Sequence, residues 1–202
     1  VKAFDVSLIL YAEHSFNVST FTARTITSSL SDIHGAITGA IASLKGPLHG
    51  GANEEVMHMM DKIKSPNNAL KWINNALDKK EVVMGFGHRV YKSGDSRVPT
   101  MRKYFAKVAK IKKDKKFEKI YDIVEKVMID RKNIHPNVDY PTGPTYHLMG
   151  FDTDFFTPIF VISRITGWSA HVLEQLSTNK LIRPLAAYNG SKHRHVSELN
   201  NR

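Results

Sequence analysis

The sequence predicts an all-α protein. Apolar residues recur at intervals of three and four positions along most of the 202-residue chain, which is the spacing of one face of a helix. No segment shows the alternation of apolar and polar residues that is typical of a strand. Hydrophobic residues make up 42% and charged residues 24% of the chain, a composition that indicates a globular protein and excludes general disorder.

The expected helices follow one another with short connections. From apolar spacing and capping residues, we place them at residues 6–10, 17–30, 33–44, 53–63, 67–77, 98–110, 115–132, 155–167 and 168–179. Asn17 or Ser19 can cap the second helix and Asp32 the third, because a short polar side chain accepts a hydrogen bond from a free N–H group at a helix start. Residues 134–150 are rich in proline and glycine, so we expect an irregular segment there. The polar tail after Gly190 is expected to be loosely held.

The expected helix at residues 33–44 carries small residues on one face, namely Gly35, Gly39 and Ser43. Residues four positions apart lie on the same side of a helix, and glycine lets another backbone approach closely. The segment is too short to span a membrane, which takes about 20 apolar residues. We therefore expect either a buried helix or a helix–helix subunit interface, and favour the interface.

The chain is strongly basic, with a formal net charge of +10. Part of the excess comes from a run of lysines at residues 107–119, and such a run is typical of a solvated helix face. Nucleic-acid binding would require base-stacking aromatic residues among the cations, and only Phe117 lies there. We therefore expect no nucleic-acid partner, and a small molecule that carries phosphate fits better.

Several other classes of site are excluded or disfavoured. The chain has no cysteine, so disulfides, thiolate nucleophiles and cysteine zinc sites are excluded. No apolar stretch reaches the roughly 18 residues of a membrane span, and the first residues lack a signal-peptide pattern, so we expect a cytoplasmic protein without a membrane partner. Ten histidines are present, but no H-E-x-x-H motif occurs, and no metal site is expected. Because the chain does not begin with methionine, we expect it to be part of a longer protein.

Three histidines stand in unusual surroundings. His49 lies in the sequence GPLHGG, His88 follows the sequence GFG, and His14 lies where the first helix is expected to end. A single histidine is more often structural than functional. The glycines beside His49 and His88, however, expose backbone N–H groups, which can bind anions.

The GFG sequence, Gly85, Phe86 and Gly87, is not a dinucleotide-binding fingerprint, because the G-x-G-x-x-G spacing fails. Lys92 and Arg97 follow it closely. Together with His88, these residues make a dense polar set that could bind a phosphate or a carboxylate.

Asp139 is the candidate general base. It stands between apolar Val138 and Tyr140, and removal of water from a carboxylate raises its pKa toward the range that suits proton transfer near neutral pH. The structural alternative is an aspartate that caps a helix or stabilises a turn.

Two further arginines are candidates for binding carboxylates. Arg164 follows an apolar run, so we expect it to be buried and to need an anionic partner. Arg183 precedes Pro184 at an expected helix end. A guanidinium group binds a carboxylate through two parallel hydrogen bonds, and with Arg97 the chain has three such groups. The alternative for each is a structural ion pair.

These segments, taken in order, resemble the citrate synthase family. The likeness rests on GPLHGGAN at 46–53, GFGHRVY at 85–91, PNVD at 136–139, SRITGW at 163–168 and IRP at 182–184. PTGPTY at 141–146 and MGFDT at 149–153 are similar to the short bacterial enzymes, especially the 2-methylcitrate synthases. The family usually has Asp-Pro-Arg where this chain has Asp95-Ser96-Arg97, a difference that concerns only the rigidity of the loop.

The resemblance implies an all-α fold with a large and a small domain, working as a homodimer, with this chain as the C-terminal half. Residues 51–150 would form the small domain, on the CoA side and with the catalytic base. Residues 1–50 and 151–202 would belong to the large domain, on the dimer and oxaloacetate side, which would be incomplete here.

The resemblance also implies a role for each candidate residue. Asp139 would deprotonate the acyl-CoA, His49 would donate a hydrogen bond to its thioester oxygen, and His88 would polarise the ketone of oxaloacetate. The residues that would bind oxaloacetate are His14, Arg97, Arg164 and Arg183, the last from across the dimer. The residues that would hold CoA are Gly85, Phe86, Gly87 and Lys92. Acyl-CoA would be a substrate, and neither a metal nor a permanently bound cofactor is implied.

The expected reaction condenses propionyl-CoA, acetyl-CoA or both with oxaloacetate and water, giving 2-methylcitrate or citrate plus CoA. An ordinary citrate synthase of the citric acid cycle is one alternative, and the related C-terminal module of an ATP-citrate lyase is another. A non-enzymatic, basic helical binding module is the alternative from a different class. That last hypothesis explains the charge but gives no reason for Asp139 or for the histidines beside glycines.

Overall fold

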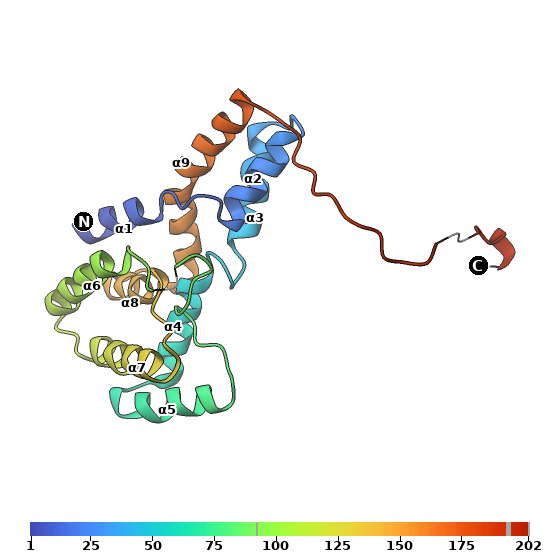
Figure 1. Ribbon diagram of the computed structural model, residues 1–202. Helices are drawn as coiled ribbons and strands as arrows, with labels where there is room; N and C mark the ends of the chain where they lie inside the picture. Colours follow the sequence, from blue (N-terminus) through green and yellow to red (C-terminus); the bar gives the residue numbers. More distant parts are fainter. Residues whose placement is uncertain (92, 193–194, 202) are drawn as a thin grey trace.

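The computed structural model describes residues 1–91, 93–192 and 195–201. Within these residues the regular structure is helical, and no strand occurs apart from one isolated bridge between Phe86 and Pro136 (Figure 1). The all-α prediction is therefore confirmed. The elements are α1 (Lys2–Tyr11), α2 (Val18–Ser28), α3 (Ile33–Leu44), α4 (Ala52–Ile63), α5 (Pro66–Asp78), α6 (Val98–Lys112), α7 (Lys116–Lys132), α8 (Asp139–Met149), η1 (Thr153–Phe155), α9 (Phe156–Ser177) and η2 (Leu199–Asn201).

The helices pack in two groups that are joined by α9 (Figure 1). Helices α2, α3 and α9 contact one another, while α4 to α8 pack mainly among themselves. Helix α1 contacts both α9 and α6, and α9 also contacts α4. The expected division into residues 51–150 and the remainder stays a prediction, although these contacts bring the two expected regions together along α1, α4 and α9.

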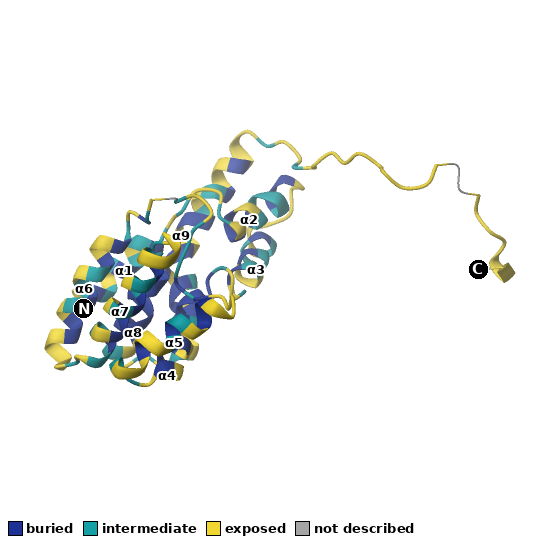
Figure 2. Cartoon of the chain, turned by 60° about the horizontal axis from the view of Figure 1, so that its bottom comes forward, coloured by how far each residue is buried: buried dark blue, intermediate teal, exposed yellow. Residues whose placement is uncertain are grey.

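The helices are held by a continuous apolar core, seen as the dark blue inner faces in Figure 2. Helix α4 runs through it with Val56, Met57 and Met60 fully buried. Flexible methionine side chains fill irregular gaps between helices, which fits their position between α5, α7 and α8. None of the described helices is both long and apolar enough to cross a membrane.

Two predicted helix caps are confirmed. The side chain of Asn17 accepts a hydrogen bond from the backbone N–H of Thr20, at 3.2 Å, at the start of α2. Asp32 accepts one from Gly35 N, at 2.7 Å, at the start of α3. These bonds satisfy N–H groups that have no partner within the helix.

The face of α3 that carries small residues is used at least partly within the chain, and the subunit interface that we favoured stays a prediction. A Cβ atom at Gly39 would collide with the side chain of Ile26 on α2. Helices α2 and α3 form the most extensively packed helix pair among the described residues, and glycine at this position allows their close approach.

The segment 134–150 is not irregular throughout, because α8 occupies Asp139–Met149. Pro141 lies in the first turn, where a helix does not need the missing N–H. Gly143 allows close packing on α4, since a Cβ atom there would lie 2.8 Å from the carbonyl oxygen of Asn53. Burial against α4 and α6 therefore overrides the low helix propensity of proline and glycine.

The two helices expected at 155–167 and 168–179 are one helix, α9. Gly167 does not interrupt it and faces the turn after α1, where an added Cβ would collide with the carbonyl oxygen of Ala12. The helix ends at Ser177, and the chain then continues as an extended, largely exposed arm (Figures 1 and 2). Arg183 therefore lies in this arm and not at a helix end, and the loosely packed tail begins well before Gly190.

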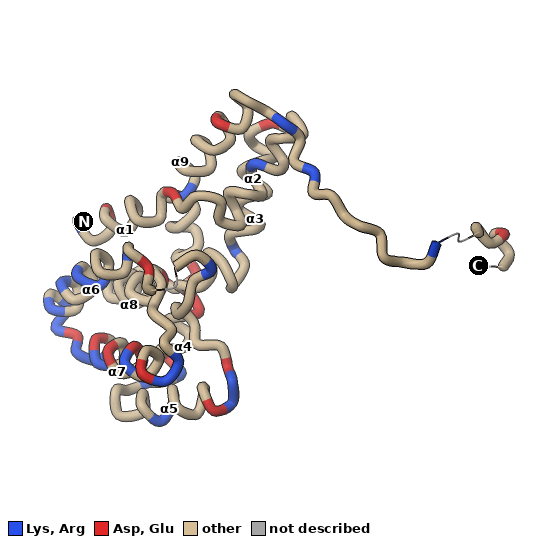
Figure 3. The backbone as a smooth tube through the Cα atoms, in the orientation of Figure 1, with Lys and Arg blue, Asp and Glu red and all other residues tan. Residues whose placement is uncertain are grey.

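The lysines at 107–119 lie at the end of α6 and the start of α7, and most of them are exposed (Figure 3). Phe117, the aromatic residue among them, is only 5% exposed. It packs in the core and offers no surface on which a nucleic-acid base could stack. The run has the arrangement of a solvated helix end, as the sequence indicated.

Candidate active site

A cleft of about 710 Å³ lies where the two groups of helices meet. Its walls come from the turn between α1 and α2, the turn before α4, the connection from residue 87 to residue 97, the start of α8 and the middle of α9. Seven of the residues singled out from the sequence line it, namely His14, His49, Gly87, His88, Arg97, Asp139 and Arg164. Segments far apart in the sequence thus converge on one site.

Asp139 is the first residue of α8 and is 9% exposed. Burial raises the pKa of its carboxyl group to about 6, against the opposing effects of a hydrogen bond from Tyr11 and the charges of Arg97 and Arg164. The hydroxyl of Tyr11 donates to Oδ1 at 2.5 Å. A carboxylate with this pKa is ionised at neutral pH and still basic enough to accept a proton, which agrees with the desolvation expected from Val138 and Tyr140.

His49 is held through its Nε2 atom by Ser19, at the start of α2. The backbone N–H of Ser19 donates to Nε2 at 3.3 Å, and the Ser19 hydroxyl lies 2.8 Å from the same atom. A backbone N–H can only donate, so Nε2 is an acceptor and the proton of the neutral ring sits on Nδ1. Burial and the charge of Arg164 lower the pKa of His49 to about 4. The ring is therefore neutral and offers an Nδ1–H donor at the cleft.

His88 has the opposite tautomer. Its Nδ1 accepts hydrogen bonds from the backbone N–H groups of Val90 and Tyr91, at 3.1 and 3.3 Å, so the ring proton sits on Nε2. Burial and Arg97 lower the pKa of His88. The irregular connection after the GFG sequence therefore leaves two backbone N–H groups free of helical partners, and these groups hold an imidazole ring and not an anion.

His14 lies in the turn after α1 and packs edge-on against His88, with ring centroids 5.0 Å apart. Its Nε2 is 3.1 Å from the hydroxyl of Tyr91. Burial and the charge of Arg97 lower the pKa of His14 to about 4. The two histidines and the tyrosine form a polar wall on this side of the cleft.

Arg164 on α9 is 1% exposed, as its apolar neighbours predicted. Its Nε donates to the carbonyl oxygen of Tyr11 at 2.5 Å, and its guanidinium lies 4.7 Å from the ring centre of Phe160. Nη1 is buried and has no hydrogen-bond partner among the described residues. Burial lowers the pKa of Arg164 to about 10, so the group stays charged at neutral pH. A buried charge of this kind requires an anionic acceptor, and Nη1 is the atom that could bind one.

Arg97 stands at the start of α6 and is held by Asp95. Its Nε and Nη2 donate to the two carboxylate oxygens at 2.9 and 2.7 Å. Asp95 also accepts the backbone N–H of Val138 at 3.1 Å, so one buried carboxylate fixes both the arginine and the residue before the candidate base. The structural ion pair and the carboxylate-binding role of Arg97 are therefore compatible, because Nη1 makes only one long hydrogen bond among the described residues, to Leu10 O at 3.5 Å.

The GFG sequence mainly supports the segment that leads to Asp139. Gly85 and Gly87 have positive φ angles of 82° and 78°, which glycine adopts readily, and their backbones pair with Asn137 and His135 at 2.9 Å. Phe86 stacks on Tyr140 with ring centroids 4.4 Å apart. Of the three residues only Gly87 lines the cleft.

Besides Gly85 and Phe86, two residues singled out from the sequence are not placed in the cleft. Lys92 lies outside the described residues. Arg183 is exposed in the arm after α9 and does not line the cleft. The CoA-binding role expected of Gly85, Phe86, Gly87 and Lys92 stays a prediction, as does the oxaloacetate-binding role of Arg183.

Sequence reasoning missed four residues that shape the cleft: Tyr11, Ser19, Tyr91 and Phe160. Tyr11 and Phe160 read as ordinary core residues of amphipathic helices, and Ser19 reads as a capping residue. The only local signal was their position close to His14, His88 and Arg164 in the sequence.

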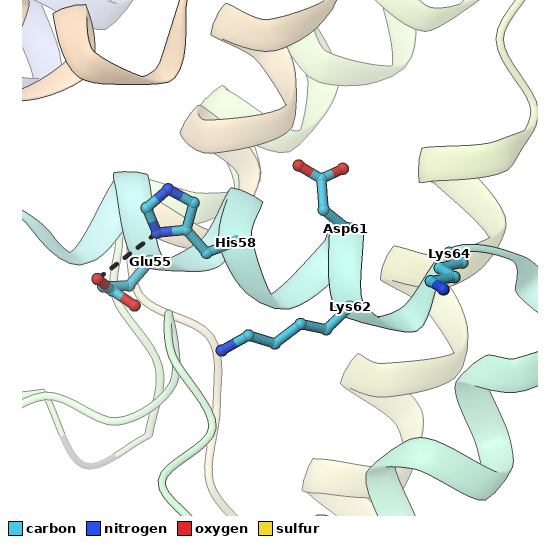
Figure 4. A pocket seen from close by; sticks show the side chains of 5 residues that line it. All are labelled: Glu55, His58, Asp61, Lys62 and Lys64. Carbon is cyan, nitrogen blue, oxygen red and sulfur yellow. Dashed lines mark ion pairs between the residues drawn. The ribbon is translucent and has the colours of Figure 1, made fainter.

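A second hollow lies on the surface of α4 and is lined by Glu55, His58, Asp61, Lys62 and Lys64 (Figure 4). Figure 4 shows these side chains spread along one helix, with His58 turned toward Glu55 at 3.6 Å. The side chains of that pair are 49% and 41% exposed, so water screens them. Nothing in this hollow matches the converging donors of the main cleft. The described residues contain no cluster of three potential metal ligands.

The main cleft can support a reaction at carbon. Asp139 can remove a proton from a carbon next to a carbonyl group, and the neutral Nδ1–H of His49 can stabilise the enolate oxygen that develops. The Nε2–H of His88 can polarise a second carbonyl group. Arg164 and Arg97 can hold a carboxylate in the same cleft.

Comparison with known proteins agrees with this arrangement. The family model described as citrate synthase, C-terminal domain, matches residues 1–185. The chain is 60% identical over 202 residues to 2-methylcitrate synthase 2 of Corynebacterium glutamicum, covering 100% of this chain and 53% of that protein. It is 55% identical over 194 residues to a citrate synthase of Mycolicibacterium smegmatis, covering 96% and 52%.

A solved structure gives the same likeness in three dimensions. The citrate synthase of Thermoplasma acidophilum, in a ternary complex with carboxymethyl-CoA and oxaloacetate, superimposes with a TM-score of 0.90 at 38% identity and covers 99% of this chain and 55% of that one. The chain thus spans about half the length of the curated relatives it matches.

Proposed function

The chain belongs to the citrate synthase family, and we propose that it is the C-terminal catalytic part of an acyl-CoA:oxaloacetate C-acyltransferase. In this proposal the enzyme condenses propionyl-CoA with oxaloacetate and water to give 2-methylcitrate and CoA. The observation that carries the proposal is the cleft itself: a buried carboxylate with a pKa of about 6 stands with two neutral histidines of opposite tautomer.

In the proposed reaction, Asp139 removes a proton from the α-carbon of the thioester, and the Nδ1–H of His49 stabilises the enolate oxygen. The enolate carbon attacks the ketone carbon of oxaloacetate, whose oxygen accepts a hydrogen bond from the Nε2–H of His88. The former ketone oxygen gains a proton, which balances the one that Asp139 removed, and the product of this step is the CoA thioester of the tricarboxylate. Water then cleaves that thioester, releasing CoA and the free tricarboxylate.

Oxaloacetate would be held by its carboxylates. The buried, unpartnered Nη1 of Arg164 supports this assignment, as does the position of Arg97 and His14 on the same cleft. Arg183 would reach the cleft of a second copy from the extended arm, which requires the homodimer. CoA would lie along Gly85–Gly87 and Lys92. The complex of the Thermoplasma acidophilum enzyme with carboxymethyl-CoA and oxaloacetate supports both substrates.

The choice of propionyl-CoA is supported by the 60% identity to a 2-methylcitrate synthase. The 55% identity to a protein named citrate synthase makes acetyl-CoA the second candidate. The two thioesters differ by one methyl group, which is worth about 0.8 kcal/mol if it is buried and costs about 1–3 kcal/mol if it overpacks the pocket.

A competition experiment with the protein at its native length tests the proposal. Equal concentrations of propionyl-CoA and acetyl-CoA are supplied with oxaloacetate, and the products are separated by mass. We expect 2-methylcitrate to be at least as abundant as citrate. A mixture dominated by citrate would assign the chain to ordinary citrate synthases, and absence of both products would refute the proposed function.

A further inference from the structure

Tyr11, on the last turn of α1, is a fully buried polar residue that the proposed reaction does not use. Its hydroxyl donates to Oδ1 of Asp139 at 2.5 Å. Its ring packs on Phe160 with centroids 4.0 Å apart. Two residues that are 128 positions apart in the sequence are thus joined by one short hydrogen bond at the base of the cleft.

We propose that Tyr11 is a positioning residue for the base in the proposed condensation, and that its hydroxyl holds Oδ1 of Asp139 so that Oδ2 accepts the substrate proton. The proposal rests on the proposed function for the identity of that proton. Among the described residues no hydrogen bond to Oδ2 occurs, while Oδ1 accepts the tyrosine. Oδ1 is therefore held by the tyrosine, and Oδ2 is left to accept the substrate proton.

The backbone of Tyr11 makes a second contribution. Its carbonyl oxygen accepts Nε of Arg164 at 2.5 Å, so one residue contacts both the base and the arginine that has a free Nη1. The tyrosine ring packs against Phe160, whose ring also contacts the guanidinium of Arg164. Tyr11 thereby fixes the base relative to the proposed oxaloacetate site.

The charge state of Asp139 depends on the groups around it. The charged and titratable groups that act on its carboxylate from the neighbouring elements are Tyr11 from α1, Asp95 and Arg97 before α6, Tyr146 from α8 and Arg164 from α9. Of these, only Tyr11 makes a hydrogen bond to the carboxylate. A short bond from a hydroxyl to an ionised oxygen is stronger than one between neutral groups, and it favours the charged form, opposing the effect of burial on the pKa.

The test is the Tyr11→Phe variant of the native-length protein. Phenylalanine keeps the ring, the packing on Phe160 and the backbone carbonyl, and it removes only the hydroxyl. We expect the acidic limb of the pH profile of kcat/KM for the acyl-CoA to move upward by about one pH unit, because a lost bond to a charged group has about that effect. The KM for oxaloacetate should change by less than about twofold, since the contact to Arg164 is retained.

A matched control is Tyr146→Phe. Tyr146 is also fully buried, and its hydroxyl donates to Ser7 at 2.9 Å and not to the base. The Tyr146→Phe variant should lose a comparable amount of stability with much less movement of the pH profile, because the hydroxyl that it removes makes no hydrogen bond to the carboxylate of Asp139. If Tyr11→Phe lowers kcat but leaves the acidic limb where it is in the wild type, Tyr11 is only structural and the proposal is overturned.

A second measurement separates this proposal from the proposed function. The carboxyl carbon of Asp139 is followed by ¹³C NMR against pH, with Asp139→Asn used to assign its signal. A higher pKa in Tyr11→Phe than in the wild type and in Tyr146→Phe supports the positioning role, even in a protein that condenses neither thioester. An unchanged pKa of Asp139 overturns it, even in a protein that makes 2-methylcitrate.

Discussion

Replacing Asp139 with asparagine should stabilise the fold at neutral pH while it abolishes most turnover. The carboxyl group is buried, and its pKa in the folded protein is about 6, above the ordinary value of 3.8. Asparagine is neutral and of similar size, and its amide oxygen can still accept the hydroxyl of Tyr11. The substitution therefore removes a buried charge and keeps the packing.

The sign and size of the effect follow from the two pKa values. Because the folded protein binds this proton more tightly than the unfolded chain, stability falls as the pH rises from about 4 to about 6 and stays at the lower level above that range. At about 1.4 kcal/mol per pH unit, the total is about 3 kcal/mol. We expect Asp139→Asn and the wild type to be about equally stable near pH 4, and the variant to be more stable by up to about 3 kcal/mol at pH 7.

Denaturant unfolding of the native-length protein at several pH values measures this difference. Asp95→Asn is the matched control, since Asp95 is a second buried aspartate beside the cleft. Burial raises the pKa of Asp95, but the hydrogen bonds and charge of Arg97 outweigh burial and lower it overall. That variant should lose about 3–5 kcal/mol at neutral pH. If Asp139→Asn is no more stable than the wild type at pH 7, or keeps near-normal kcat, the assignment of Asp139 as a buried base with a raised pKa is wrong.

Three other outcomes are expected. Arg164→Lys should raise the KM for oxaloacetate about ten- to a hundredfold, because lysine keeps the charge but loses the planar guanidinium group that binds a carboxylate through two hydrogen bonds. The control Arg131→Lys, at an exposed position on α7, should leave the KM for oxaloacetate unchanged. An equal KM in the two variants would show that Arg164 has only a structural role. Gly167→Ala should lower the free energy of unfolding by about 1–3 kcal/mol, measured by thermal unfolding, because the added Cβ would collide with the carbonyl oxygen of Ala12. Gly46→Ala should lower it by less, because the nearest described atom to its Cβ would be the carbonyl oxygen of Ser43, at 3.6 Å. The isolated 202-residue chain should aggregate in sedimentation experiments, because α2, α3 and α9 expose large apolar side chains, and a monomer with a sharp melting transition would contradict this.

Most of the fold could be predicted from the sequence because its helices are amphipathic and have recognisable caps. Helix α8 could not, since Pro141, Gly143 and Pro144 argue against a helix when each is considered alone. All three are buried, and Gly143 makes the close approach to α4 possible. The information that makes this segment helical lies largely in the surfaces of α4 and α6, against which it packs.

The candidate site could be predicted at positions where a charged residue stands among apolar neighbours in the sequence. Asp139 beside apolar residues and Arg164 after an apolar run are groups that burial makes costly, so a functional or structural partner was expected for each. Tyr11 and Ser19 raise no such conflict. A tyrosine on an apolar helix face and a serine at a helix start are ordinary there, and their contacts with Asp139 and His49 appear only when distant segments are brought together.

The irregular sequence around the histidines has a physical cause. A neutral imidazole ring is fixed in one tautomer when a group that can only donate or only accept contacts one of its nitrogens, and a backbone N–H is a group that can only donate. Inside a helix these N–H groups are used by carbonyl oxygens, so free ones occur at helix starts and in irregular segments. His49 uses the N–H of Ser19 in the first turn of α2, and His88 uses those of Val90 and Tyr91 in the connection before α6. A helix start and an irregular connection thus supply the donors that leave Nδ1–H on one histidine and Nε2–H on the other, and two such N–H groups can each stabilise charge on a carbonyl oxygen.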